Sequence, residues 1–319
     1  MHALICGFGS IGRRHLRHLR ALGVTRIDAY RTGLATFPDD SHSKPDRTFS
    51  DLDEALRQGP DVVLVTNPTA FHVETARRAV EAGCHVLIEK PVSDSLAGLA
   101  DLDALASARG LVVSVAQNLR YHPTLLALRR LIQDQGMGQA VMFRAHFGAF
   151  LPAWHPWEDY RNSYAARRAL GGGCRRTHIH EVDFAIWLMG SAERAVSLDS
   201  GCSPLGTDVD EATAILIRHR SGALSIVSLS LAQAPTSRTV DVAFTEGTFS
   251  VDLRSGDWSS RPRDGEEIRG CPPPGFDMDQ TYREQDAAFL RAVQTDQSAP
   301  VPLGEAIEVL RIALSGEED

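Results

Sequence analysis

The sequence has few cysteines and lacks any long hydrophobic run. No C-x-x-C pair occurs, so neither a disulfide framework nor a cysteine zinc site is indicated by the five scattered cysteines, Cys6, Cys84, Cys174, Cys202 and Cys271. No apolar stretch approaches the ~18 residues that a membrane-spanning helix needs. A signal-peptide pattern is also missing, because Met1 and His2 lead straight into a short apolar run. We therefore expect a cytoplasmic protein that does not bind membranes.

The chain also has fewer basic than acidic residues. The 319 residues carry a formal net charge of -8, which argues against binding to nucleic acid or to an anionic membrane surface. The apolar fraction of 43% and the charged fraction of 23% are ordinary for a globular protein with a full core. A chain of this length is expected to form about two domains.

The first third of the chain alternates short apolar runs with helical patterns. Helices are expected near 10–22, 51–58, 70–82 and 94–109, between strands at 2–6, 26–30, 61–66, 85–88 and 111–115. The run D-V-V-L-V-T at 61–66 is typical of a strand buried on both faces of a parallel sheet. The pattern predicts an α/β fold, a doubly wound parallel sheet of the Rossmann type over residues 1–118.

The remaining residues, 119–319, show a different pattern and predict an α+β domain on an open, mainly antiparallel sheet. Its expected strands are 140–147, 212–218, 223–231, 239–245 and 247–253. We expect a glycine-led helix over 171–189, a surface loop over 255–275, and closing helices at 281–295 and 304–314 that can pack back on the first domain. An open sheet face needs covering, which favours a homodimer or homotetramer through this sheet.

The chain opens on the spacing G-x-G-x-x-G, formed by Gly7, Gly9 and Gly12 between a strand and a helix. The first glycine makes the tight turn, the second lets the backbone approach a pyrophosphate, and the third lets helix and strand pack closely. The helix N-terminus attracts the anion. The alternative is a glycine-rich turn with no ligand. The sequence predicts dinucleotide binding by this segment, which also includes Phe8, Ser10 and Ile11.

The choice of cofactor depends on the end of the second strand. An NAD enzyme places an acidic residue there, about 20 residues beyond the glycines. Nineteen residues past Gly12 lies Arg31, whereas Asp28 comes three positions earlier, inside the strand. An arginine suits a 2′-phosphate, so NADP is favoured over NAD; the alternative is a solvated loop arginine and a site that takes either. The basic stretch at 13–20 is expected to be mostly a solvated helix face; the alternative is that it adds positive potential near the phosphates.

Two further segments follow strands of the parallel sheet, T-N-P-T-A-F-H (66–72) and E-K-P (89–91). Ligands of doubly wound sheets bind at these carboxyl ends. A lysine at the end of an apolar strand is a candidate for proton transfer; the alternative is an ordinary surface lysine. The candidate residues of the two segments are Thr66, Asn67, Pro68, His72, Glu89 and Lys90.

The second domain supplies a histidine motif and an aromatic segment. In H-I-H-E-V-D (178–183), His180 and Asp183 are three residues apart and share a helix face. His178 and His180 lack a third nearby ligand, so no metal is expected. Aromatic and arginine side chains at 154–168 can stack on a pyranose and meet phosphate or carboxylate; the alternative is a packed loop. Its candidate aromatics are Trp154, Trp157, Tyr160 and Tyr164.

Together these segments resemble the Gfo/Idh/MocA family of nicotinamide-dependent sugar oxidoreductases. N-L-R-Y-H-P (118–123) resembles the family's crossover into the second domain, and F-T-E-G-T-F-S-V-D (244–252) its late sheet strand. The segment 149–173 is most similar to members from bacterial surface-glycan and nonulosonic-acid sugar pathways. The resemblance implies that Lys90 and His180 are catalytic. It also implies that Asn118 contacts the cofactor and that substrate is bound by Arg120, Trp157, Tyr160, Tyr164, Arg176 and Asp183.

One departure from the family is visible. Relatives often carry an aspartate about four residues before the histidine, whereas this chain has Arg176 and Thr177 there. The resemblance implies hydride transfer between NAD(P) and a hydroxyl or keto carbon of a sugar or nucleotide sugar. Three alternatives stay open: a relative that keeps NAD bound for epimerisation or glycoside cleavage, a non-catalytic cofactor sensor, and a dehydrogenase of a cyclitol or biliverdin-like substrate.

Overall fold

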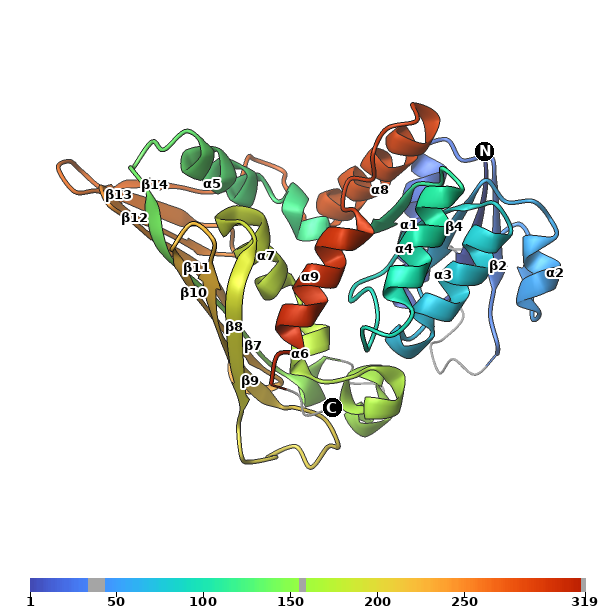
Figure 1. Ribbon diagram of the computed structural model, residues 1–319, viewed down its shortest axis with the longest axis horizontal. Coiled ribbons are helices and arrows are strands. Elements are labelled where there is room, and N and C mark those ends of the chain that lie inside the picture. The colour runs from blue at the N-terminus through green and yellow to red at the C-terminus, as the bar shows by residue number, and fades with distance from the viewer. Residues whose placement is uncertain (34–43, 155–158, 317–319) are drawn as a thin grey trace. The chain divides into compact units, whose positions relative to one another are not determined.

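The computed structural model describes residues 1–33, 44–154 and 159–316 (Figure 1). The chain divides into two compact units, Met1–Asn118 with Asp279–Ile307, and Leu119–Met278 with Glu308–Asp319. The first unit therefore includes a segment from near the end of the chain. No helix in the described ranges is both long and apolar enough to cross a membrane.

The first unit is built on a six-stranded parallel sheet with the order β3-β2-β1-β4-β5-β6. Its strands are β1 (His2–Cys6), β2 (Arg26–Tyr30), β3 (Thr48–Phe49), β4 (Val62–Val65), β5 (His85–Ile88) and β6 (Val113–Val115). The central strands are buried on both faces, as their unbroken apolar sequences predict. The predicted doubly wound sheet is confirmed, and β3 is a short addition to it.

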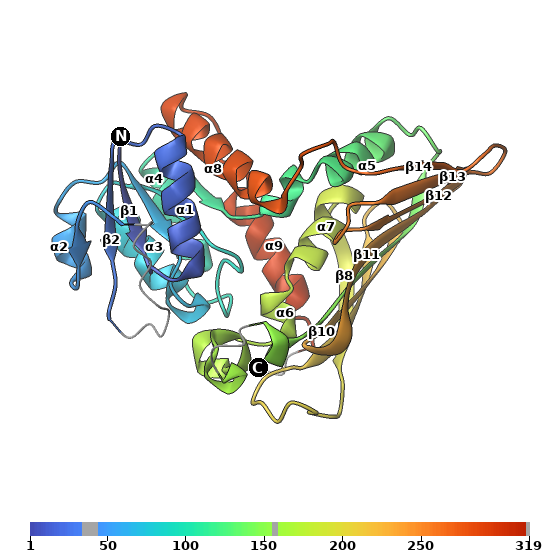
Figure 2. The same ribbon diagram turned by 180° about the vertical axis from the view of Figure 1, so that it is seen from behind.

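Helices cover both faces of this sheet (Figures 1 and 2). They are α1 (Ser10–Ala21), α2 (Leu52–Leu56), α3 (His72–Glu81), α4 (Leu99–Ala108), α8 (Met278–Gln294) and the first part of α9 (Leu303–Ala313). Leu16 and Leu19 of α1 share a buried core with Phe289 and Leu290 of α8.

The basic face of α1 differs from its prediction. Arg13, His15 and His18 are buried, whereas Arg17 remains exposed. The expectation of a mostly solvated face is therefore wrong for these three side chains. His15 and His18 are buried because α8, more than 250 residues away in the sequence, places Asp286 beside both rings.

The second unit is built on an eight-stranded sheet with the order β14-β13-β12-β11-β7-β10-β9-β8. Only β7 and β10 pair in parallel, so the predicted, mainly antiparallel sheet is confirmed. Helices α6 (Cys174–Thr177) and α7 (His180–Met189) lie against one face of the sheet, and the opposite face carries no helix of this unit in the described ranges (Figures 1 and 2). The strands are β7 (Ala140–Phe150), β8 (Ala192–Asp199), β9 (Ala212–His219), β10 (Leu224–Ser230), β11 (Ala232–Phe244), β12 (Gly247–Asp252), β13 (Trp258–Pro262) and β14 (Ile268–Gly270).

Two segments of this unit correct the sequence analysis. The segment 255–275 is not only a loop, because β13 and β14 extend the sheet there. Trp258 stacks on Phe249 of β12 at 5.6 Å between ring centres, and a Cβ at Gly270 would lie 2.5 Å from the Trp258 ring. The expected helix over 171–189 is two helices, α6 (Cys174–Thr177) and α7 (His180–Met189), which are separated at His178. A further helix, α5 (Pro123–Gln133), was not predicted.

Candidate functional site

The three glycines of the first turn each occupy the position that their spacing predicts. Gly7 has a φ of +102°, and a Cβ there would lie 2.5 Å from the backbone nitrogen of Asn67. A Cβ at Gly12 would lie 2.2 Å from the carbonyl oxygen of Gly7. Around Gly9 no heavy atom lies within 4 Å of the same test position. Neighbouring protein atoms therefore leave no room for a side chain at Gly7 and Gly12, whereas the space around Gly9 is open.

The N-terminus of α1 completes this cradle. Gly9 is its N-cap residue, and no side chain caps the first turn. The free backbone N–H groups and the helix dipole suit a pyrophosphate, and Gly9 leaves the approach clear. These features fit a dinucleotide. Phe8 is buried with Arg13 over its ring at 5.5 Å, Ser10 is exposed, and Ile11 is half-buried.

The segment after β4 packs directly on this turn. The hydroxyl of Thr66 donates to the Gly7 carbonyl at 2.5 Å. The Asn67 amide donates to Thr75 at 2.9 Å, and Pro68 is exposed. The ring of His72 lies between the carbonyls of Asn67 and Pro91, at 2.8 Å from each. Burial lowers the pKa of the His72 ring. His72 thereby connects the two candidate cofactor segments.

The segment after β5 carries Glu89 and Lys90. Glu89 is buried, and Lys90 is half-buried beside it. One oxygen of Glu89 accepts from the backbone N–H of Lys90 at 3.1 Å, and the other lies 3.1 Å from His15 of α1. The turn before Lys90 is therefore held by side-chain contacts within the first unit.

The end of β2 bears on the choice of cofactor. Asp28 is 1% exposed and is held by His2 at 3.0 Å and by Arg26 at 2.7 Å. Both contacts are made by one oxygen of its carboxylate, Oδ2. Arg31 follows the strand, is half-buried, and donates its backbone N–H to Phe49. No acidic residue lies at 30–33, where an NAD enzyme usually places one.

The last candidate in the first unit is Asn118. It is buried, and its amide donates to the hydroxyl of Thr281 on α8 at 2.7 Å. This contact fixes the end of the first unit's main segment against the helix that returns to it.

In the second unit, the three consecutive glycines at 171–173 allow neighbouring segments to pack closely. A Cβ at Gly172 would lie 2.5 Å from the carbonyl oxygen of Tyr164, and one at Gly173 would lie 2.0 Å from Asp210. Asp210 accepts from the backbone N–H of Arg175 at 2.8 Å. Close approach of these backbones places α6, and after it α7, against the sheet.

Two sequence candidates, Arg120 and Asp183, form one buried ion pair. The guanidinium donates to both carboxylate oxygens, at 2.9 and 2.7 Å, and Asp183 is 0% exposed. The same guanidinium lies 5.7 Å from the ring centre of Trp187. This bidentate geometry fixes the first turn of α7, which begins at His180.

A second ion pair holds the next residue of that turn. Glu181 is 0% exposed and accepts from Arg238 of β11 at 2.6 Å. Arg238 also lies over the ring of Phe147 at 4.4 Å. His180 itself is buried, and its ring is nearly parallel to that of Phe184 at 6.4 Å. The first turn of α7 is thus held by guanidinium groups from two different segments.

The remaining substrate candidates differ in their surroundings. The hydroxyl of Tyr160 donates to the Leu205 carbonyl at 2.9 Å, and Arg161 lies over its ring at 4.6 Å. Tyr164 is 36% exposed, and Arg176 is half-buried. Trp157 lies outside the described residues. In the described ranges, no group of three or more His, Cys, Asp or Glu side chains could hold a metal ion.

Two family models match this chain, one in each unit. A model described as "Oxidoreductase family, NAD-binding Rossmann fold", of the Gfo/Idh/MocA family, matches residues 1–117, and the GFO/IDH/MocA C-terminal domain model matches residues 125–250. The chain belongs to the Gfo/Idh/MocA oxidoreductase family. It is therefore an NAD(P)-dependent oxidoreductase.

Individual members of the family resemble nearly the whole chain. The uncharacterized oxidoreductase YrbE of Bacillus subtilis (strain 168) is 26% identical and is aligned over 98% of this chain and 92% of its own. D-xylose 1-dehydrogenase (NADP(+)) 2 of Haloferax volcanii is 25% identical over 79% of this chain and 75% of its own. A levoglucosan dehydrogenase complexed with NADH and levoglucosan has the same fold, with a TM-score of 0.87, 18% identity, and coverage of 98% and 95%.

Several buried charged residues of this Gfo/Idh/MocA oxidoreductase were not predicted from its sequence. Arg175 is 0% exposed and donates to Ser197, Asp199 and the carbonyls of Ala313 and Ser315. Only its place beside the triple glycine could have singled it out. The partners of His15 and Glu181 lie far away in the sequence, so no local spacing signals them; they are Asp286 and Arg238.

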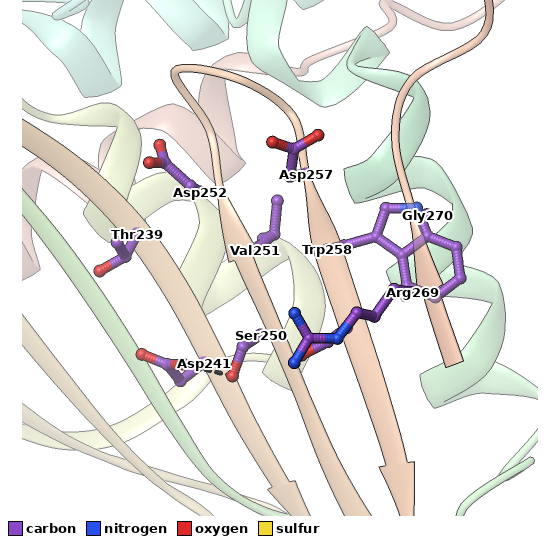
Figure 3. Close-up of a pocket in the computed structure, with 10 residues that line it drawn as sticks. Thr239, Asp241, Ser250, Val251, Asp252, Asp257, Trp258, Arg269 and Gly270 are labelled. Atoms are coloured by element: carbon purple, nitrogen blue, oxygen red, sulfur yellow. Dashed lines mark hydrogen bonds between the residues drawn. The ribbon is translucent and has the colours of Figure 1, made fainter. Parts of the chain in front are cut away.

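A hollow of about 580 Å³ in this oxidoreductase lies on β11–β14 (Figure 3). Ser250 donates to Asp241 at 2.6 Å within it. Its lining includes none of the residues that the sequence predicted for the site. The hollow is a feature of the sheet and not of the cofactor segments.

Proposed function

We propose that this oxidoreductase transfers a hydride reversibly between NAD(P) and a hydroxyl or keto carbon of a sugar or nucleotide sugar. One observation carries the proposal. An open glycine cradle at an uncapped helix N-terminus shares the carboxyl edge of one parallel sheet with the turn of Lys90. Support for a sugar comes from relatives named for D-xylose and levoglucosan.

The protein residues manage the proton of the reacting hydroxyl. The nicotinamide ring, when bound, supplies a hydride acceptor or donor at its C4 atom. In the oxidation direction, Lys90 or His180 takes the hydroxyl proton, and the other residue orients the hydroxyl. In the reduction direction, the same residue returns the proton. Asp183 supports this step through the first turn of α7, because its carboxylate is held by Arg120.

The amino-acid usage of the chain supports a chemical role for Lys90. Of 33 lysine and arginine residues, only Lys44 and Lys90 are lysines. Arginine is protonated at all ordinary pH values, whereas a lysine can give up its proton. A chain that otherwise uses arginine almost throughout therefore has lysine at the position where proton transfer is proposed.

For the cofactor, we favour NADP over NAD. Arg31 follows β2, whereas Asp28 lies inside the strand with one carboxylate oxygen bound to His2 and Arg26. A guanidinium at the end of this strand suits a 2′-phosphate. One relative is named for NADP(+) and one solved structure for NADH. The choice within this chain therefore depends on Arg31.

The substrate is proposed to carry a phosphate or carboxylate. Tyr160, Tyr164 and Arg176 supply aromatic faces and a cation in the second unit, with Trp157 expected to add to them. Sugars of bacterial surface-glycan and nonulosonic-acid pathways have this chemistry and are the class we propose first.

The open face of the eight-stranded sheet is proposed to pair with the same face of a second copy. Val196, Leu216 and Ile226 lie side by side on β8, β9 and β10 and are 48%, 49% and 37% exposed. Leu198, which is 75% exposed, extends this row. An apolar row of this kind is stabilised when a partner covers it.

A panel of sugars and nucleotide sugars, assayed with NAD and NADP at 340 nm, tests the function. Turnover with at least one sugar is expected. Cofactor that stays bound without a net absorbance change, together with conversion of the sugar, would favour epimerisation or glycoside cleavage. Cofactor binding without conversion of any sugar would favour a sensor, for which Arg176 and Thr177 in place of a carboxylate give a reason.

A further inference from the structure

The ring of His15 lies inside the first unit with carboxylates at both of its nitrogens. Nδ1 is 2.8 and 3.0 Å from the two oxygens of Asp286, and Nε2 is 3.1 Å from Glu89. His15 and Asp286 are each 0% exposed. Carboxylate oxygens only accept hydrogen bonds, so both ring nitrogens must donate. Only the imidazolium form has two N–H groups, and the geometry therefore requires a buried cation.

The other groups around this ring agree with a cation. Nδ1 of His18 lies 3.5 Å from Asp286, and its Nε2 lies 2.8 Å from Asp279. Gln285 donates to Asp286 at 3.4 Å. Burial alone would lower the pKa of His15, but Asp286 and Glu89 outweigh burial and raise it to about 10. The ring is thus charged at neutral pH.

Glu89 connects His15 to the turn that carries Lys90. One of its oxygens accepts from His15, and the other accepts from the backbone N–H of Lys90 at 3.1 Å. The side chain is only 8% exposed, so little water can replace a lost donor. The orientation of Glu89, and with it the backbone of Lys90, depends on the ring of His15.

The same ring belongs to the helix that forms the cofactor cradle. α1 begins immediately after Gly9, and His15 lies in its second turn. One side chain therefore connects three segments: the cradle helix α1, the turn that carries Lys90, and α8.

We propose that His15 is a positioning residue, an imidazolium that fixes the turn of Lys90 relative to the cradle helix through Glu89. The proposal rests on the function proposed above, in which Lys90 handles a proton. It goes beyond that function because it assigns a task to a histidine that contacts neither the proposed substrate nor the cofactor.

Two matched substitutions separate this task from simple stabilisation. The amide of asparagine can replace Nδ1 of histidine and keep the contact to Asp286, whereas that of glutamine can replace Nε2 and keep the contact to Glu89. His15→Asn and His15→Gln both remove the charge, and only the first removes the donor to Glu89. We expect His15→Asn to lower kcat by about 10-fold or more, as for the loss of other outer supporting contacts, with KM for sugar and Kd for NADPH within about threefold. We expect His15→Gln to lower kcat by about threefold or less.

The controls address folding and general damage. His18→Asn makes the same change one turn later on α1, without a contact to Glu89, and should leave kcat unchanged. If His15→Asn does not fold, His15→Asn with Asp286→Asn restores the original net charge of the cluster and takes its place. Equal kcat losses in His15→Asn and His15→Gln, or losses that follow the melting temperature across the set, would overturn the proposal.

A readout without turnover makes use of the two lysines of the chain. In a Lys44→Arg background, Lys90 is the only lysine, so reductive ¹³C-methylation gives one lysine signal. At pH 7, the ¹³C chemical shift of this signal should change in His15→Asn and stay unchanged in His18→Asn. If the wild-type protein converts no sugar, the proposed function fails and this shift alone decides the positioning proposal; an unchanged signal in His15→Asn then refutes it.

Discussion

The two units hold their candidate catalytic residues by buried charges of different kinds. In the first unit, the turn of Lys90 depends on His15, a cation that can lose its proton. In the second unit, the turn of His180 depends on Arg120 and Arg238, which stay charged at any ordinary pH. The difference teaches that the contacts that hold a catalytic candidate can depend on pH in one unit and be independent of pH in the other.

The largest expected effect comes from breaking the guanidinium pair in the second unit. Arg120→Met leaves Asp183 buried without its cation, which typically destabilises a fold by about 3–5 kcal/mol. Urea denaturation measures this change. Arg129→Met is the matched control, because Arg129 lies over the same Trp187 ring at 4.7 Å but is only half-buried. Equal losses in the two variants would show that Asp183 tolerates the absence of Arg120.

Replacement of each catalytic candidate sharpens the comparison at the level of chemistry. Lys90→Met should reduce turnover by ~10²-fold or more and leave NADPH binding nearly intact, because acid–base groups contribute on that scale. His180→Asn, measured in the same steady-state assay, should show a loss of similar size if both residues share the proton. Wild-type turnover in Lys90→Met would remove that residue from the mechanism.

The pH dependence of stability should differ between the two kinds of support. The pKa of His15 is raised from about 6.5 to about 10, so its stabilising contribution is complete below about pH 6.5 and is lost as the pH rises through about 10. The difference in melting temperature between wild type and His15→Asn should therefore be largest near pH 6–7 and shrink towards pH 10.5. A constant difference across this range would mean that the ring is neutral throughout.

The smallest expected effect concerns the cofactor. Arg31→Ala should weaken NADPH binding by about 10-fold through loss of a charge-assisted contact, and should change NADH binding little. Fluorescence titration of both cofactors measures this. A wild-type preference for NADH would contradict the assignment of Arg31 before any variant is made.

Local patterns were sufficient for the architecture. The alternation of short apolar runs with helical patterns and the apolar run of β4 predicted the parallel sheet, because these features depend on neighbours within one βαβ unit. The strands β13 and β14 were missed because Trp258 is paired by tertiary contacts and not by a recognisable alternation.

The supporting charges could not be predicted in the same way. His15 was assigned to a solvated face because α1 carries arginines on either side of it, and the helix that covers it lies near the end of the chain. The family resemblance implied that Asp183 is a substrate ligand, and in the structure its carboxylate forms an ion pair with Arg120. Spacing reveals which residues share a face, whereas the partner of a buried charge is set by the fold.

The long separation between His15 and Asp286 has a consequence for biosynthesis. The two residues are 271 positions apart, and a ribosome completes the N-terminal part of a chain first. While the chain is being made, α1 has neither the carboxylate that neutralises His15 nor the apolar cover of Phe289 and Leu290. The dinucleotide-binding unit can therefore be completed only after α8, more than 250 residues beyond α1, has been synthesised.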